Sequence, residues 1–232
     1  MRDQFRVESF KAVRFWMIYV GIAIMAAAGF AYGYLKFPSG IDSAKVFSLT
    51  LCDTSLMFIA TSIVSWFVGN DFLNRTIHNE IKLGRTRFSV IFTKSIVSFV
   101  ISALIHMTYV VSTVAGFWAR YGFDSTMFKS RNLIWSLVIL VQIGAIVGCV
   151  MFIVFALKKA LAGIAFTVVF TFFTCNMLRN FLSDKDFFKL SCFSLAQTDD
   201  DRTLIYSAVF GALTLVAALI GAHIVFRKAE IK

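Results

Sequence analysis

Six long apolar stretches, separated by short polar segments, constrain the fold of this chain more than any other feature. They cover residues of about 15–35, 46–69, 95–118, 133–156, 160–178 and 204–226. A helix needs roughly 20 apolar residues to cross the hydrocarbon core of a bilayer, and backbone groups in lipid must find their partners within the segment. The sequence therefore predicts an all-α, polytopic membrane protein with six transmembrane helices, and we expect a single membrane domain over residues 1–232.

The composition agrees with this class and argues against soluble ones. Hydrophobic residues make up 59% of the 232 residues, and the mean hydropathy is +0.79, whereas soluble domains are about half apolar or less. The net charge is +10, and the charged residues lie mainly between the apolar stretches. The positive-inside bias of membrane proteins accounts for this distribution, so we expect no nucleic-acid partner. The four cysteines show no CxxC or Cys/His spacing, and we expect no metal site.

The first apolar stretch has two interpretations. Four basic residues precede it, and Ala26–Ala28 resembles the small-residue cleavage site of a signal peptide. The apolar run continues through Leu35, however, which is long for a signal peptide and sufficient for a span. We therefore expect an uncleaved first span.

The distribution of Lys and Arg predicts that both termini lie in the cytoplasm. In that orientation the cytoplasmic segments carry fourteen Lys and Arg residues and the outer loops carry nine, which is the bias of multi-pass membrane proteins. The last outer loop, 179–203, contains five aspartates together with Phe187, Phe188 and Phe193. Either an acidic solvated loop or a partly inserted hairpin fits this segment, and we favour the hairpin.

The basic segment Asn70–Lys94 predicts a short cytoplasmic helix. Asn70 or Asp71 can cap its start, Ile77 and Ile81 lie on one face with Leu73, and Gly84 supplies the left-handed residue that commonly ends a helix. We expect an amphipathic helix of about 13 residues, roughly 20 Å long. Such a helix fits a lipid surface or a groove in a partner protein, and the pattern itself does not separate the two.

The third span is expected to begin before its apolar stretch does. Its first turn is placed near Phe88, and the Lys94 side chain is expected to extend toward the lipid headgroups, as long basic side chains do near the ends of membrane helices.

The same segment carries a resemblance to a known family. After Phe67-Val68-Gly69 come, in order, Asp71-Phe72, Arg75-Thr76-Ile77, Asn79, Gly84, Arg87 and Lys94. This pattern resembles the permease subunits of bacterial type-2 ATP-binding-cassette (ABC) exporters, in the branch of the bacitracin- and lantibiotic-resistance permeases. The match covers about 25 residues, and the six spans and the chain length extend it loosely. Arg85 departs from the pattern, because the branch more often has a small residue there.

The resemblance implies that this helix is a coupling helix, which sits in a groove of the ATPase subunit and transmits its closure to the membrane helices. Ile77 and Ile81 would then form the apolar plug of the contact. The implied docking residues are Asp71, Phe72, Arg75, Thr76, Ile77, Asn79, Glu80, Ile81, Gly84, Arg85 and Arg87. The implied function is export of a hydrophobic peptide, antibiotic or lipid-like substrate across the bacterial plasma membrane.

The implied partners are a dimeric ABC ATPase, a second permease that is identical or paralogous, and membrane lipids. The sequence contains no G-x-x-x-x-G-K-[ST], H-E-x-x-H or G-x-S-x-G motif. We therefore expect this chain to be no enzyme and to hold no cofactor, with ATP and Mg²⁺ bound by the partner.

Two other functions stay open. One is a secondary transporter or channel driven by an ion gradient, which predicts broken helices, internal repeats and a denser set of intramembrane charges. The other is a membrane immunity protein without transport. The single carboxylate within the apolar stretches and the lack of an evident repeat weigh against the gradient-driven function.

Polar and small residues within the stretches mark further candidate sites. Asp53, His106 and Gln142 are candidates for a substrate path, because ionisable and polar groups are costly in lipid; structural or interfacial roles are the alternative. Gly29 and Gly33 are spaced for close helix contact. We favour packing within one bundle for such pairs, and the resemblance makes these two the best candidates for a dimer interface.

Overall fold

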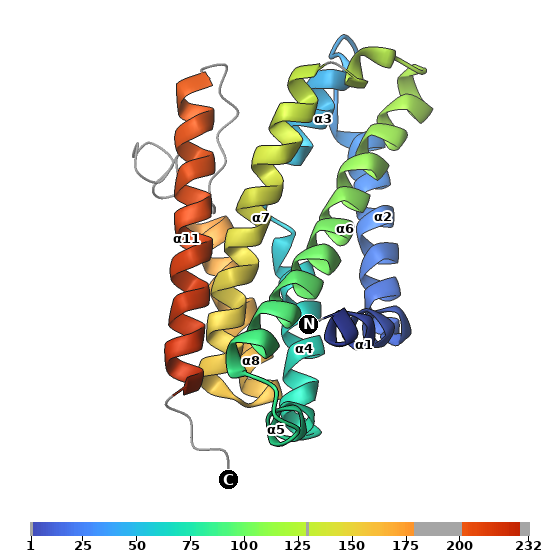
Figure 1. Ribbon diagram of the computed structural model, residues 1–232. Coiled ribbons are helices and arrows are strands. Elements are labelled where there is room, and N and C mark those ends of the chain that lie inside the picture. The colour runs from blue at the N-terminus through green and yellow to red at the C-terminus, as the bar shows by residue number, and fades with distance from the viewer. Residues whose placement is uncertain (1, 129, 179–200, 228–232) are drawn as a thin grey trace.

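The computed structural model describes residues 2–128, 130–178 and 201–227, and every element in these ranges is a helix. Figure 1 shows long helices running side by side, with the amino-terminal helix lying crosswise near one end of the bundle. We call this the inner end and the opposite one the outer end, as labels only. Five helical segments are long and apolar enough to cross a membrane. They are α2 (Trp16–Lys36), α6 (Arg87–Tyr121), α7 (Ser130–Leu157), α8 (Ala160–Phe172) continued by the π-helix η2 (Phe173–Leu178), and α11 (Asp201–Arg227). The predicted helical, multi-pass membrane fold is therefore confirmed.

The second predicted span, 46–69, is not a continuous helix. It consists of α3 (Ser43–Leu51) and the shorter apolar helix α4 (Met57–Leu73), separated by residues 52–56. Within this break the Ser55 N–H donates to Asp53 Oδ1 at 3.0 Å, a local side-chain bond of the kind that competes with helix formation. Five of the six predicted spans are therefore present as candidate membrane helices, whereas the stretch 46–69 holds two shorter helices instead of one.

Glycines bring α2 and α6 into close contact. A Cβ on Gly29 would lie 2.5 Å from the Tyr109 carbonyl oxygen, and one on Gly33 would lie 1.9 Å from that of Thr113. Both glycines are buried against α6 of the same chain. These contacts agree with the favoured interpretation, packing within one bundle, and a dimer interface at these glycines stays a prediction.

Two further helix pairs complete the bundle. Helix α7 lies along α11, where Gly148 faces Leu215, and α4 lies along α8, where the Thr61 and Thr171 hydroxyls are 3.2 Å apart. Helix α6 contacts α2, α3, α4, α7 and α11. At 35 residues it is about 52 Å long, and it forms the centre of the fold.

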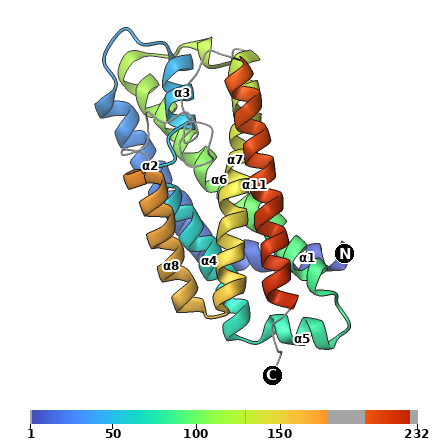
Figure 2. The same ribbon diagram turned by 90° about the vertical axis from the view of Figure 1, so that its left-hand side faces the viewer.

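Two short helices mark the inner end of the bundle. Helix α1 (Arg2–Arg14) lies crosswise beside the start of α2, and α5 (Thr76–Lys82) lies beyond α1 at the extremity. The carboxyl end of α11 lies at this end as well, whereas α3 and η1 (Ser125–Phe128) lie at the opposite end (Figures 1 and 2). The segment 179–200 is outside the described residues, and its hairpin stays a prediction.

Asp124 joins α3 to the loop after α6 at the outer end. Its Oδ2 accepts from the Ser43 N–H at 3.1 Å and from the Thr126 hydroxyl at 2.5 Å, and its Oδ1 accepts from the Thr126 N–H at 2.9 Å. Hydrogen bonds from Thr126, followed by those from Ser43, lower the pKa of Asp124 to about 2. The carboxylate therefore fixes the start of α3 while it is ionised.

We expect Asp124→Asn to lower the melting temperature in detergent by a few degrees, measured by circular dichroism, because the amide replaces an acceptor with a donor. The pKa is lower in the folded state, so Asp124 stabilises the fold above about pH 4, and this contribution is lost as the pH falls toward 2. Asp42→Asn is the matched control, since Asp42 precedes the same helix without capping it through its side chain. Equal melting temperatures for the two variants would contradict the assigned role.

Candidate functional site

A short helix is present in the predicted segment, but it begins later than the sequence indicates. Helix α4 continues through Leu73, and Arg75 then adopts a left-handed backbone with φ of 54°, which separates α4 from α5. The expected start at Asn70 or Asp71 is wrong because the buried Asp71 and Phe72 belong to the last turns of α4. The seven residues of α5 replace the 13 expected.

The end of α5 follows the prediction. Gly84 has φ of +85°, its N–H donates to the Ile81 carbonyl at 3.0 Å, and the Arg85 N–H donates to the Glu80 carbonyl at 3.2 Å. These bonds form the Schellman ending that glycine favours. The expectation that Gly84 ends the helix is confirmed.

The start of α6 is also close to its predicted position. Helix α6 begins at Arg87, and the Thr86 hydroxyl caps it by accepting from the Ser89 N–H at 3.3 Å. The Arg87 guanidinium donates to the Phe226 carbonyl at 2.7 Å and to that of Arg227. A cation is favourable at a helix carboxyl end, so Arg87 binds the end of α11 within the chain.

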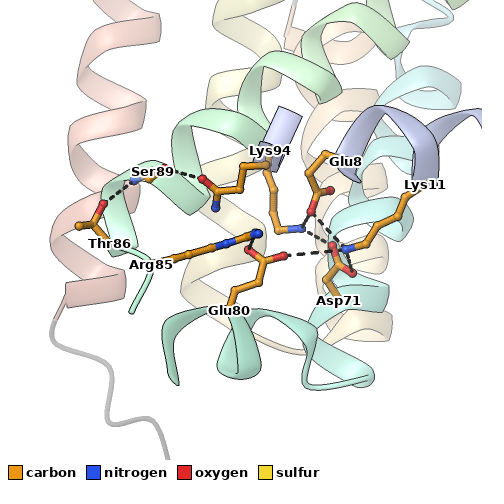
Figure 3. Close-up of polar contacts among 9 residues, drawn as sticks. Glu8, Lys11, Asp71, Glu80, Arg85, Thr86, Ser89 and Lys94 are labelled. Atoms are coloured by element: carbon orange, nitrogen blue, oxygen red, sulfur yellow. Dashed lines mark hydrogen bonds and ion pairs between the residues drawn. The ribbon is translucent and has the colours of Figure 1, made fainter. Parts of the chain in front are cut away.

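A cluster of buried charged side chains, the ion cluster, lies between α5 and the rest of the bundle (Figure 3). The Lys94 ammonium contacts Glu8 Oε1 at 2.9 Å and Asp71 Oδ2, and the lysine is only 1% exposed. The prediction that Lys94 extends toward the headgroups is therefore wrong, because two carboxylates hold its charge inside the protein. This contact joins α1, α4 and α6.

The cluster continues outward to α5. The Lys11 ammonium lies 3.3 Å from Asp71 Oδ1 and 4.0 Å from Glu80 Oε1, and Arg85 Nη1 lies 3.5 Å from Glu80 Oε2. Burial opposes the charge on Lys11, but attraction to Asp71 and Glu8 and the hydrogen bonds with them outweigh it and raise its pKa. Three carboxylates and three cations thus connect α5 to α1, α4 and α6 (Figure 3).

The inward face of α5 is part of the chain's own core. Ile77 is 1% exposed, and Ile81 packs partly buried against the same core. Phe72, just before α5, contacts the rings of Phe155 and Phe226. The expectation that Ile77 and Ile81 form an outward plug is corrected, because both side chains serve internal packing; Thr76 is half-buried beside them.

Two exposed leucines flank α5 in the chain, one at the end of α4 and one just after α5. Leu73 is 71% exposed and Leu83 is 81% exposed. Exposed polar residues accompany them, namely Arg75, Asn79 and Lys82. We call Leu73, Arg75, Asn79, Lys82 and Leu83 the α5 surface. Sequence reasoning missed Leu83 because it lies off the apolar stripe and next to the terminating glycine.

A polar cavity lies beside the break in the second span. Its volume is about 440 Å³, and Thr50, Asp53, Ser55 and Asn176 line it together with apolar residues that include Phe37. This size is within the usual range of small-molecule sites. The cavity can therefore hold a small molecule or part of a larger one.

The described contacts group two of the three substrate-path candidates. Tyr109 donates to Asp53 at 3.4 Å, and His106 Nε2 lies 3.1 Å from the carbonyl oxygen of Leu51, just before the break. Gln142 instead donates from α7 to the Ser207 hydroxyl of α11 at 2.7 Å. Asp53 and His106 thus belong to one region, and Gln142 belongs to a helix contact elsewhere.

Comparison of the chain with protein-family models, with curated proteins and with solved structures gives no match. Within the part of the chain that the structure describes, no three His, Cys, Asp or Glu side chains are placed to hold a metal ion. The geometry alone thus defines two candidate regions, which are the α5 surface with its ion cluster and the cavity beside the break between α3 and α4.

We expect Lys94→Met to destabilise the fold by about 3–5 kcal/mol, because it leaves the buried Glu8 and Asp71 carboxylates without their main cation. The loss is measurable as a lower melting temperature and lower recovery of monodisperse protein in detergent. Lys11→Met is the matched control, since the Lys11 side chain is 31% exposed and a partly solvated pair contributes less. A Lys94→Met protein as stable as the Lys11→Met protein would contradict the role of the cluster.

Proposed function

We propose that this chain is the membrane-spanning permease subunit of a type-2 ABC exporter, with ATP hydrolysed by a separate subunit. The observation that carries the proposal is the placement of α5. This short helix lies past the crosswise helix α1 at the end of the bundle, and an exposed leucine lies before it (Leu73) and after it (Leu83). A buried ion cluster attaches it to three other helices.

The α5 surface has the composition of a protein contact. Leu73 and Leu83 supply exposed apolar anchors, and Arg75, Asn79 and Lys82 supply exposed polar groups between them in the chain; protein contacts commonly combine both kinds of residue. We propose that an ABC ATPase subunit binds this surface. In this arrangement Asp71, Glu80 and Arg85 hold α5 against the bundle through the ion cluster and do not contact the partner.

The ion cluster gives a route for transmitting movement. Asp71 is on α4 and Lys94 is on α6, and both belong to the cluster that holds Glu80 of α5. Displacing α5 without moving these helices would separate buried charges, which is costly. We therefore propose that closure of the ATPase dimer moves α1, α4, α5 and α6 together.

The remaining parts of the proposal follow from the same orientation. Helix α1 and the end of α11 lie at the end of the bundle that carries α5 (Figures 1 and 2), which supports both termini on the cytoplasmic side. A second permease, identical or paralogous, completes the exporter in the bacterial plasma membrane. The proposed substrate is a hydrophobic peptide, antibiotic or lipid-like molecule.

The broken second span favours a second candidate function, a gradient-driven transporter. Broken helices with a polar group at the break form the ion and substrate sites of many secondary transporters, and Asp53 lies at such a break beside a cavity. Purified protein in liposomes separates the candidates. A gradient-driven transporter moves substrate under an imposed ion gradient alone, and Asp53→Asn abolishes this movement, whereas the exporter requires the ATPase and ATP.

For the exporter, we expect the double substitution Leu73→Asp/Leu83→Asp to reduce co-purification of a co-expressed ABC ATPase subunit by about tenfold, since buried charge at apolar anchors is unfavourable. Permease-stimulated ATP hydrolysis should fall in parallel. Leu157→Asp is the matched control, because it changes an exposed leucine at the end of α7. Unchanged retention of the ATPase by the double variant, or an equal loss in the control, would refute docking at α5.

A further inference from the structure

A lateral groove lies between α1, α2 and α6 at the inner end of the bundle. Its volume is about 440 Å³, and its walls include Ile18 and Ile22 of α2 and Val97, Val100 and Leu104 of α6. The lining of α6 extends from Ile96 to Leu104, which is about 12 Å along the helix axis. The walls are almost wholly apolar, so the groove suits a hydrocarbon chain.

Helix α1 forms part of the groove wall and carries exposed cations. Ser9, Ala12 and Val13 of α1 belong to the groove lining, and Arg6 and Arg14 are exposed on the same helix. The Arg14 guanidinium lies 4.2 Å from the centre of the Phe10 ring, which is itself exposed. A crosswise helix that exposes arginines beside apolar side chains is typical of the membrane interface.

We propose that this groove binds an acyl chain of an anionic phospholipid, whose headgroup lies against Arg6 and Arg14 of α1. Charge complementarity selects this occupant, because the groove is apolar and the exposed cations Arg6 and Arg14 of α1 outnumber its one exposed acid, Asp3. Glu8 and Lys11, on the same helix, contact the ion cluster instead. A bound lipid therefore holds α1 between the membrane and the cluster.

The test quantifies lipid bound to the purified full-length chain. The protein in mild detergent is mixed with equal amounts of phosphatidylglycerol and phosphatidylcholine with the same acyl chains, and native mass spectrometry counts each bound lipid. We expect a preference for phosphatidylglycerol that falls about fivefold for each arginine removed in Arg6→Gln/Arg14→Gln, the effect of one cation near an anionic surface. Arg6→Lys/Arg14→Lys should keep most of the preference.

Two matched controls make the result specific. Lys158→Gln/Lys159→Gln removes two exposed cations from the turn between α7 and α8 and should leave the preference unchanged. Val100→Trp fills the groove and should reduce binding of both lipids, whereas Val111→Trp, at an exposed position of α6 outside the groove, should not.

Three results would overturn the proposal. They are no preference for phosphatidylglycerol in the unmodified protein, an equal fall of that preference in Lys158→Gln/Lys159→Gln, and equal lipid binding by the two tryptophan variants. The tryptophan pair carries the test if the arginine variant does not fold. None of these measurements involves an ATPase, so failure of the exporter proposal leaves them unaffected.

Discussion

The ammonium of Lys94, enclosed between the carboxylates of Glu8 and Asp71, determines how the inner end of this protein is built. A charge removed from water costs several kcal/mol unless partners surround it, and the three groups come from α6, α1 and α4. Each helix must therefore keep its position for the other two to remain paired. Glu80 and Arg85 extend the same requirement to α5.

The opposite half of the bundle contains the break between α3 and α4, within the second apolar stretch. Irregular backbone within a membrane persists where protein groups or a cavity satisfy it. Here His106 lies 3.1 Å from the Leu51 carbonyl oxygen, and Asn176 donates to that of Ser55 at 3.2 Å. Asn176 belongs to the π-helix η2, a local widening often found at functional sites. The break is thus supported from two other helices and adjoins the cavity.

Local sequence signals predicted the parts of the structure that depend on neighbouring residues. Hydropathy located the membrane helices, and the Gly84 turn and the start of α6 near Phe88 follow from backbone preferences. The burial of Lys94 could not be predicted, because it depends on Glu8, which lies 86 residues earlier in the chain. Ile77 shows the same limit: periodicity gives a helix an apolar face, but the tertiary fold decides whether that face turns toward the chain's own core or toward a partner.

The length of α6 has a consequence for how the two ends of the protein relate. This unbroken helix, about 52 Å long, is longer than the hydrocarbon core of a bilayer. Its first residue follows the Thr86 cap beside α5, and Asp124 follows shortly after its last residue. In the proposed exporter, tilting this unbroken helix at the end beside α5 would displace the α3 junction at its other end. Communication between the two faces then needs no chain of side-chain rearrangements through the bundle.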